Sequence, residues 1–194
     1  TLDPSTTDWE YQIKAVDIYG RESLPSAITT IRPLDVQASD LPVYNLEIST
    51  ENLARLQADI WTYDEVPATV SIDGRQYAAE VRFRGHVGRE YPKKSWKIIF
   101  RGESPIAPRD RMNLRAQYED ASLLRGQLTS WIYDAVGIRP PHSRQVLLFV
   151  NGDYAGLFND FEQVDARYMA RTGRDANASV YGTRWTKLGN WGDI

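Results

Sequence analysis

Alternating apolar and polar residues predict two strands, 81–84 and 95–100, on either side of a glycine-containing loop. In the second strand three large apolar side chains share one face, which leaves Lys97 on the other. Gly85 and Gly88 in the loop tolerate positive φ and allow a ligand to approach the backbone closely. Basic residues stand on both sides of the loop, so the pattern suits an anion such as a polyphosphate. A basic face that is merely solvated is the open alternative.

Apolar patterns and turn residues predict further strands and hairpins on both sides of this region. Residues 43–49 form a strand, and a helix opens at Thr50. Two-residue turn signals, Asp73-Gly74 and Asn151-Gly152, predict hairpins. The strands that these turns join are 66–72 with 76–84, and 146–150 with 154–158, and one more strand is expected at 180–185. The continuous apolar run at 146–150 predicts a strand buried on both faces and therefore central in its sheet.

A helix is predicted over 121–136, with Asp120 as its N-cap and Gly137 at its end. Its expected buried stripe consists of Leu124, Leu128, Trp131 or Ile132, and Ala135. Capping of the helix is sufficient to explain an aspartate at position 120, and a contact between Asp120 and a ligand is an open alternative. Asp165 is likewise expected to cap a short helix that starts at Ala166.

The N-terminal residues predict a separate small unit. Residues 9–19 alternate as a half-buried strand, and 27–31 follow as a second strand after a turn. These residues resemble the last two strands of a fibronectin type III domain. We therefore expect the end of such a domain at 1–33, a linker rich in proline and aspartate at 34–42, and a second domain at 43–194.

Composition narrows the classes of function. The net charge is −3, so the chain as a whole has no electrostatic footprint for nucleic acid. No run approaches the roughly 18 apolar residues of a membrane helix, and no membrane span is predicted. The chain has no cysteine, which excludes disulfides and thiolate metal sites, and with only His86 and His142 a histidine-based zinc site is not expected.

Four short motifs in order resemble the CotH kinase family, of the spore-coat protein H type. The resemblance covers about Leu41 to the C-terminus. In chain order the motifs are Arg82-Phe-Arg-Gly85; Pro92-Lys-Lys-Ser-Trp-Lys97; Met112-Asn-Leu114 with Asp120-Ala-Ser-Leu-Leu-Arg125; and Val150-Asn-Gly-Asp-Tyr-Ala-Gly-Leu157 leading to Glu162-Gln-Val-Asp165. After Arg84-Gly85 the family usually has a small polar pair, whereas this chain has His86-Val87-Gly88.

This resemblance implies an α+β fold in which a twisted antiparallel sheet with one packed helix resembles a protein kinase N-lobe, beside the small N-terminal β segment. It implies part of an atypical secreted or surface kinase that transfers the ATP γ-phosphate to serines of a structural protein, with ATP and Mg²⁺ as cofactors. The expected location is extracellular or at the cell surface. The expected nucleotide contacts are Arg84, Lys94, Lys97 and Glu162. No metal ligand is assigned, and the catalytic residues are expected beyond Ile194, so this chain alone is expected to be inactive.

Other interpretations stay open at this point. Glu162 suits a surface acid at a strand end equally well. The expected helix carries only Asp134 as an acid, near its C-terminal end, and so lacks the mid-helix Glu that a typical kinase pairs with its strand lysine. The His86-Val87-Gly88 departure and the fibronectin-like strands favour a non-catalytic surface module for adhesion or structure. Six Trp and eleven Tyr make carbohydrate binding a third, weaker alternative.

Overall fold

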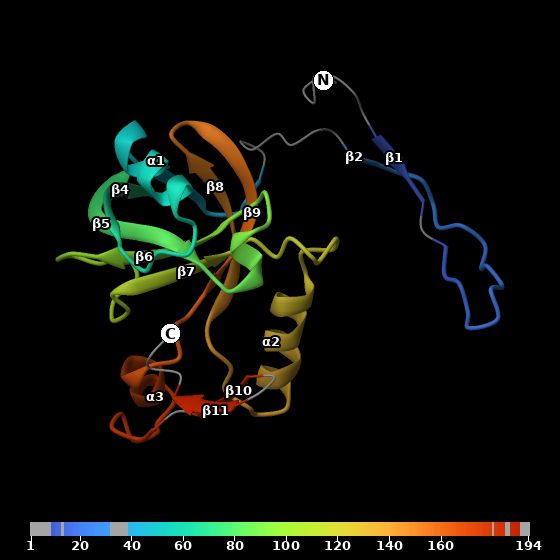
Figure 1. Ribbon diagram of the computed structural model, residues 1–194. Helices are drawn as coiled ribbons and strands as arrows, with labels where there is room; N and C mark the ends of the chain where they lie inside the picture. The colour runs from blue at the N-terminus through green and yellow to red at the C-terminus, as the bar shows by residue number, and fades with distance from the viewer. Residues whose placement is uncertain (1–8, 13, 32–38, 180, 185–186, 191–194) are drawn as a thin grey trace. The chain divides into compact units, whose positions relative to one another are not determined.

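The computed structural model describes residues 9–12, 14–31, 39–179, 181–184 and 187–190. These fall into two compact units, Thr1–Asp40 and Leu41–Ile194 (Figure 1). The predicted linker 34–42 lies mostly outside the described residues. The identity of the first unit as the end of a fibronectin type III domain stays a prediction.

In the first unit, β1 (Trp9–Tyr11) pairs antiparallel with β2 (Thr29–Ile31). Both strands are shorter than the sequence predicted, and the described residues between them include one turn and one isolated bridge, between Val16 and Glu22. The alternation failed as a guide to strand length because these apolar side chains are not buried: Ile18 is 91% exposed. A strand gains little from an apolar face that has nothing to pack against.

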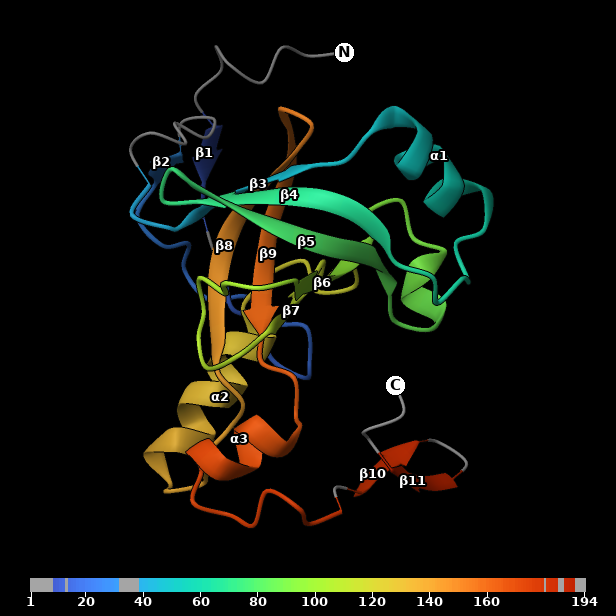
Figure 2. The ribbon, with the colours of Figure 1, turned by 90° about the vertical axis from the view of Figure 1, so that its left-hand side faces the viewer.

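Seven strands in the described part of the second unit form a closed barrel in the order β3-β4-β5-β6-β7-β9-β8. They are β3 (Val43–Glu47), β4 (Val66–Ile72), β5 (Arg75–Arg84), β6 (Ser95–Phe100), β7 (Arg111–Arg115), β8 (Ser143–Val150) and β9 (Asp153–Phe161). Figure 2 shows β8 and β9 crossing beside β3, β4 and β5.

Closure into a barrel corrects the expectation of a twisted antiparallel sheet that resembles a protein kinase N-lobe. Neighbouring strands are antiparallel except β3 and β8, which pair in parallel from Val43 with Leu147 to Leu46 with Val150. Both strands are rich in apolar residues, and pairing them removes the two edges that an open sheet would leave. The mixed α+β class is confirmed, and β8 lies between β9 and β3, as every strand of a closed barrel lies between two others.

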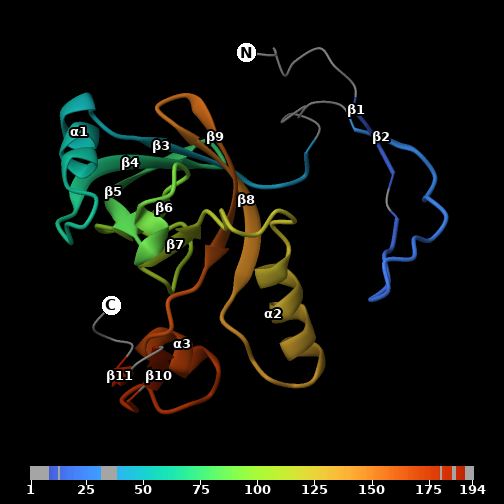
Figure 3. The same ribbon diagram turned by 45° about the vertical axis from the view of Figure 1, so that its right-hand side comes forward.

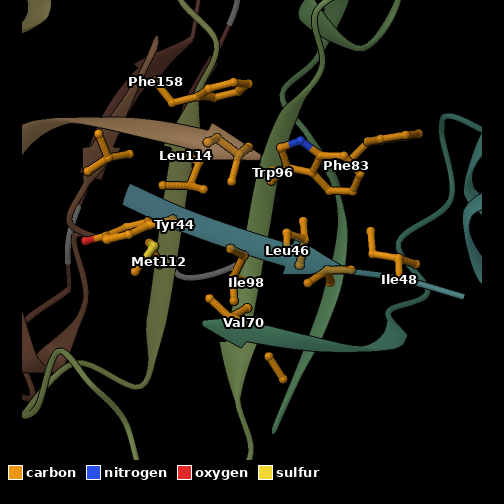
Figure 4. Close-up of a cluster of buried hydrophobic side chains, with 14 of the residues drawn as sticks. Tyr44, Leu46, Ile48, Val70, Phe83, Trp96, Ile98, Met112, Leu114 and Phe158 are labelled. Atoms are coloured by element: carbon orange, nitrogen blue, oxygen red, sulfur yellow. The ribbon is translucent and has the colours of Figure 1, made fainter. Parts of the chain in front are cut away.

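The barrel interior holds the core, which takes alternate residues from its strands (Figure 4). Trp96, Ile98 and Phe100 of β6 point inward, with exposed fractions of 5% or less. Tyr44 and Leu46 of β3 are fully buried among them. The predicted direction of β6 is therefore confirmed, and Lys97 lies on the outer side of the barrel.

Both predicted hairpin turns are present. Asp73 and Gly74 have φ values of 50° and 75°, and Asn151 and Gly152 have 51° and 87°. Positive φ at both central residues gives the turn whose twist matches paired strands. In contrast, β7 was not anticipated as a strand, because the sequence indicated only a loop before it and a motif within it.

Three α-helices occur in the described residues of this unit. Ser49 caps α1 (Thr50–Ala58), since its side chain accepts a hydrogen bond from the Asn52 N–H at 3.2 Å. Asp165 caps α3 (Ala166–Arg171), as predicted, by accepting from the Arg167 N–H at 2.9 Å. The last strands, β10 (Tyr181–Arg184) and β11 (Lys187–Asn190), pair with each other, while Val180 and Trp185 lie outside the described residues.

The helix α2 (Arg125–Ala135) starts four residues later than predicted. Its expected buried stripe is exposed: Leu128 is 52%, Trp131 61% and Ile132 53% accessible. The buried side chains of the helix are Gln127 and Ser130. Figure 3 shows α2 beside β8. The Ser143 hydroxyl of β8 donates to Gln127 Oε1 at 3.4 Å. Periodicity located the helix correctly but assigned the wrong face to the core.

Candidate functional site

The outer face of β5, β6 and β7 carries a concentration of basic side chains. Strand pairing sets Arg84 opposite Ser95 and Arg82 opposite Lys97, which in turn faces Asn113 of β7. These residues alternate with the core positions, so their side chains lie outside the barrel. Three cations on two neighbouring strands therefore share one surface.

Next to this surface lies a cavity of about 480 Å³. One wall is the loop between β5 and β6, where Gly85 adopts φ 104° and Val87–Arg89 form a short 3-10 helix. The opposite wall is the segment that joins β7 to α2. Four cationic side chains line the cavity: Arg84, Lys93, Arg115 and Arg125. The other lining residues are Gly85, Gly88, Tyr91, Ser95, Ala116, Gln117, Tyr118, Glu119, Asp120 and Gly126.

Arg84 and Arg115 have no carboxylate partner in the part of the chain that the structure describes. Burial, together with the positive charges of Arg115, Arg82 and Arg89, lowers the pKa of Arg84 to about 10. Burial also lowers the pKa of Arg115, whose guanidinium carbon lies 4.7 Å from the centre of the Phe161 ring. Both side chains are still protonated at neutral pH, and an anion between them would relieve their repulsion.

The two acids of the cavity are engaged by other partners. Glu119 accepts a short hydrogen bond from the Tyr91 hydroxyl, and the Tyr91 ring stacks on Tyr118 at 4.9 Å. Asp120 accepts from the Ser122 hydroxyl at 2.6 Å and from the Arg125 N–H at 2.9 Å. Neither carboxylate is paired with Arg84 or Arg115, so these acids do not neutralise the two guanidinium groups.

Lys93 is held in place on the cavity wall. Its ammonium group donates to the Leu157 carbonyl at 2.5 Å and lies 4.5 Å from the centre of the Phe158 ring. Burial lowers the pKa of this ammonium. A Cβ on Gly156 would lie 3.3 Å from Lys93 Nζ, so the absence of a side chain at Gly156 makes space for the lysine.

The structure separates the four residues that the sequence singled out. Arg84 lines the cavity, and Lys97 lies on the same outer face of the barrel but is not a lining residue. Lys94 donates to the Arg89 carbonyl at 2.5 Å. Glu162 is 2% exposed and accepts from the His142 N–H at 2.8 Å and from Arg171 Nε at 3.0 Å. Their assignment as nucleotide contacts stays a prediction.

Sequence reasoning missed Lys93, Arg115 and Arg125 as members of this site. Lys93 and Arg125 stood inside motifs that were recognised, but nothing in the spacing distinguished Lys93 from Lys94. Arg115 would have been found if residues 111–115 had been predicted as a strand, because alternation from the buried Met112 and Leu114 then turns Arg115 outward.

Two negative findings apply to the described residues. They contain no group of three or more His, Asp or Glu side chains arranged to hold a metal ion. None of their helices has the length and apolar character needed to cross a membrane.

Comparison with known proteins places this chain among its relatives. The sequence profile of the family described as CotH kinase protein matches residues 81–190, more than half of the chain. The chain belongs to the CotH kinase protein family. It is 30% identical over 133 residues to inner spore coat protein H of Bacillus subtilis, an alignment that covers 69% of this chain and 37% of that protein. It is 31% identical over 107 residues to invasin CotH2 of Rhizopus delemar, covering 52% of this chain and 18% of that protein.

The chain therefore spans little more than a third of one CotH relative and less than a fifth of the other. The family profile begins at Val81 and includes the loop between β5 and β6, β6, β7, α2 and the β8–β9 hairpin. All four cationic side chains of the cavity fall within the matched residues.

Proposed function

We propose that the cavity binds phosphate groups of ATP, and that the chain supplies this part of an atypical kinase that phosphorylates serines of a structural protein. The observation that carries the proposal is the convergence of four cationic side chains on one cavity, with Arg84 and Arg115 lacking a carboxylate partner in the described residues. Charge-assisted contacts to phosphate are the strong interactions that such groups form.

The arrangement of elements supports the proposal by analogy. In a protein kinase N-lobe, a glycine-containing loop and one helix stand on either side of the strands that face ATP. Here the loop between β5 and β6 and the start of α2 stand on either side of the outer face of β6 and β7. The closed barrel differs from an open lobe, so the analogy concerns this face and not the whole sheet.

The described residues do not fit a magnesium site. Mg²⁺ requires oxygen ligands, normally at least one free carboxylate. In the cavity, Asp120 and Glu119 are already engaged by hydrogen bonds within the protein. We propose that the metal ligands and the catalytic base of the kinase belong to other parts of the whole protein, and no step of the reaction is assigned to the residues described above.

The names of the relatives support a location and a partner class. One relative is named as a spore coat protein and the other as an invasin. We therefore propose a coat or cell-surface location, with a secreted or coat structural protein as the phosphate acceptor.

Replacing Arg84 by methionine is expected to weaken binding of ATP at least tenfold, since one charge-assisted contact is worth roughly 1.5–3 kcal/mol. Lys97→Met is expected to have the same effect if the ligand extends along the outer face of β6. Isothermal titration calorimetry with this chain and with the full-length protein measures both. Arg75→Met is the matched control, because Arg75 starts the same strand and is exposed. Unchanged affinity in Arg84→Met would remove the cavity from consideration as the phosphate site.

The chain by itself is expected to incorporate no phosphate into serine-rich acceptor peptides, although the whole protein does so. Its cations position an anion, but transfer also needs a metal-holding carboxylate and a base. The measurement is radiolabel transfer from ATP by residues 1–194. Transfer that disappears in Glu162→Gln or Asp165→Asn would show that the catalytic acids lie within this chain.

A second candidate, a non-catalytic adhesion module, is favoured by two observations. One relative is named as an invasin, and α2 exposes Leu128, Trp131 and Ile132. The two functions predict opposite outcomes in calorimetry. An adhesion module binds neither ATP nor pyrophosphate, and Arg84→Met leaves its behaviour unchanged.

A further inference from the structure

Asp120 occupies an unusual position between the cavity and the start of α2. Its residue is 8% exposed, and its carboxylate accepts hydrogen bonds from the Ser122 N–H at 3.1 Å, the Ser122 hydroxyl at 2.6 Å and the Arg125 N–H at 2.9 Å. The Ser122 hydroxyl in turn accepts from the Leu124 N–H at 3.2 Å. One side chain thus fixes the turn that leads into the helix and the first N–H of the helix itself.

This turn needs such a restraint because its backbone is unfavourable. Gln117 and Leu123 have φ values of 48° and 54°, a region that residues other than glycine seldom adopt. Besides Asp120, the turn is held by Gln145 of β8, whose Nε2 donates to the Leu123 carbonyl at 2.9 Å. Without the Asp120 carboxylate, the segment from residue 120 to residue 125 would lose two hydrogen bonds from backbone N–H groups and one from the Ser122 hydroxyl.

The start of α2 approaches the cavity closely. A Cβ on Gly126 would lie 2.6 Å from Gln117 Nε2 and 3.5 Å from Asn159 Nδ2, so only glycine fits without a shift. Asn159 is 1% exposed, and its Nδ2 has no hydrogen-bond partner. This unpaired donor lies 3.5 Å from the position that a Cβ of Gly126 would take, and Gly126 lines the cavity. A helix N-terminus, an unpaired amide and the nearby guanidinium of Arg125 together present donors to an anion.

We propose that Asp120 is a positioning residue for the phosphate site: it holds the first turn of α2, with Arg125 and the Gly126 N–H, against the cavity. The inference rests on the proposed phosphate-binding function and names the group that orients the helix toward the ligand. Asp120 does not touch the anion, because its carboxylate oxygens are directed to Ser122 and Arg125.

Neutralising Asp120 changes anion affinity in opposite directions depending on whether Asp120 positions α2 or acts only through its charge. Asp120 is a negative charge beside an anion site, and Arg125 Nε lies 3.5 Å from its Oδ1. If its charge were all that mattered, neutralising it would strengthen anion binding. If it positions α2, neutralising it weakens binding, because the helix start and Arg125 lose their fixed geometry. Glu119 is the matched control, since it lines the same cavity but is bonded to Tyr91 and not to α2.

The test is titration of the chain with inorganic pyrophosphate in the presence of EDTA, by calorimetry, on the wild type and on Asp120→Asn and Glu119→Gln. Asp120→Asn is expected to bind pyrophosphate at least about fivefold more weakly, because it loses one contact from the helix terminus or one charge-assisted contact. Glu119→Gln is expected to bind about twofold more tightly, as removal of an exposed negative charge predicts. Amide chemical shifts provide the second measurement. Pyrophosphate should shift the Gly126 N–H resonance in the wild type and leave it in place in Asp120→Asn.

Folding of each variant is checked by its melting temperature. If Asp120→Asn does not fold, Ser122→Ala takes its place, because it removes one hydrogen bond to Asp120 and one from Leu124. Equal or tighter pyrophosphate binding by the folded Asp120→Asn, or by Ser122→Ala in its place, would overturn the positioning role alone. A wild-type chain that binds neither pyrophosphate nor ATP would overturn the proposed phosphate site itself.

Discussion

Replacing Arg89 by methionine is expected to lower the free energy of unfolding by about 3–5 kcal/mol, because three backbone carbonyl groups would each lose the donor that the buried guanidinium supplies. Arg89 is 2% exposed and donates to the carbonyls of Gly85 at 2.9 Å, Thr62 at 3.0 Å and Ile60 at 3.2 Å. These contacts tie the loop between β5 and β6 to the segment after α1. Chemical denaturation of the purified chain measures the loss.

Arg101→Met is the matched control. Arg101 forms an ion pair with Glu80, but 58% of its side chain is exposed, so its loss is expected to cost less than about 1 kcal/mol. A similar stability for Arg89→Met and Arg101→Met would mean that the carbonyl groups around Arg89 find other donors, and that Arg89 does not hold the loop.

Asp160→Asn is expected to destabilise the barrel by about 3–5 kcal/mol, because it leaves a nearly buried guanidinium without its counter-charge. Asp160 is fully buried, and its two oxygens accept from the two terminal nitrogens of Arg109 at 3.2 Å and 3.0 Å. Arg144 Nε lies 3.6 Å from the same carboxylate. Only 11% of the Arg109 side chain is exposed, so water cannot replace the lost partner.

The comparison for this variant is Asp110→Asn. Asp110 also contacts two arginines, Arg111 and Arg167, but its side chain is 34% exposed, and a loss below about 1 kcal/mol is expected. Equal midpoints of urea denaturation for the two variants would contradict the view that burial of Asp160 makes its pairs important.

The loop between β5 and β6 has several cationic side chains beside it, and their number does not show which of them contact a ligand. Arg89 and Lys94 flank the same glycines as Arg84, and alternation alone did not separate them. In the structure, Arg89 and Lys94 donate to backbone carbonyl groups, whereas Arg84 lines the cavity. Which cation binds an internal carbonyl depends on the path of residues 60–63, far away in the sequence, so local patterns could not decide it.

The sequence by itself determined the features that depend on neighbouring residues. The hairpins at Asp73-Gly74 and Asn151-Gly152, the cap of α3 at Asp165 and the outward direction of Lys97 follow from turn chemistry and alternation. Four ordered motifs also identified the CotH kinase family, which the family profile confirms.

Only the tertiary structure decided the features that depend on distant partners. Closure of the barrel requires β3 to meet β8, about 100 residues later in the chain. The exposed apolar side chains of α2 follow from its packing on polar groups of β8, which a helical period cannot reveal. The cavity likewise needs Arg84 and Arg115 on different strands and Gly126 on a helix. The sequence encodes each local element, but the free energy of packing between distant elements selects which side chains meet.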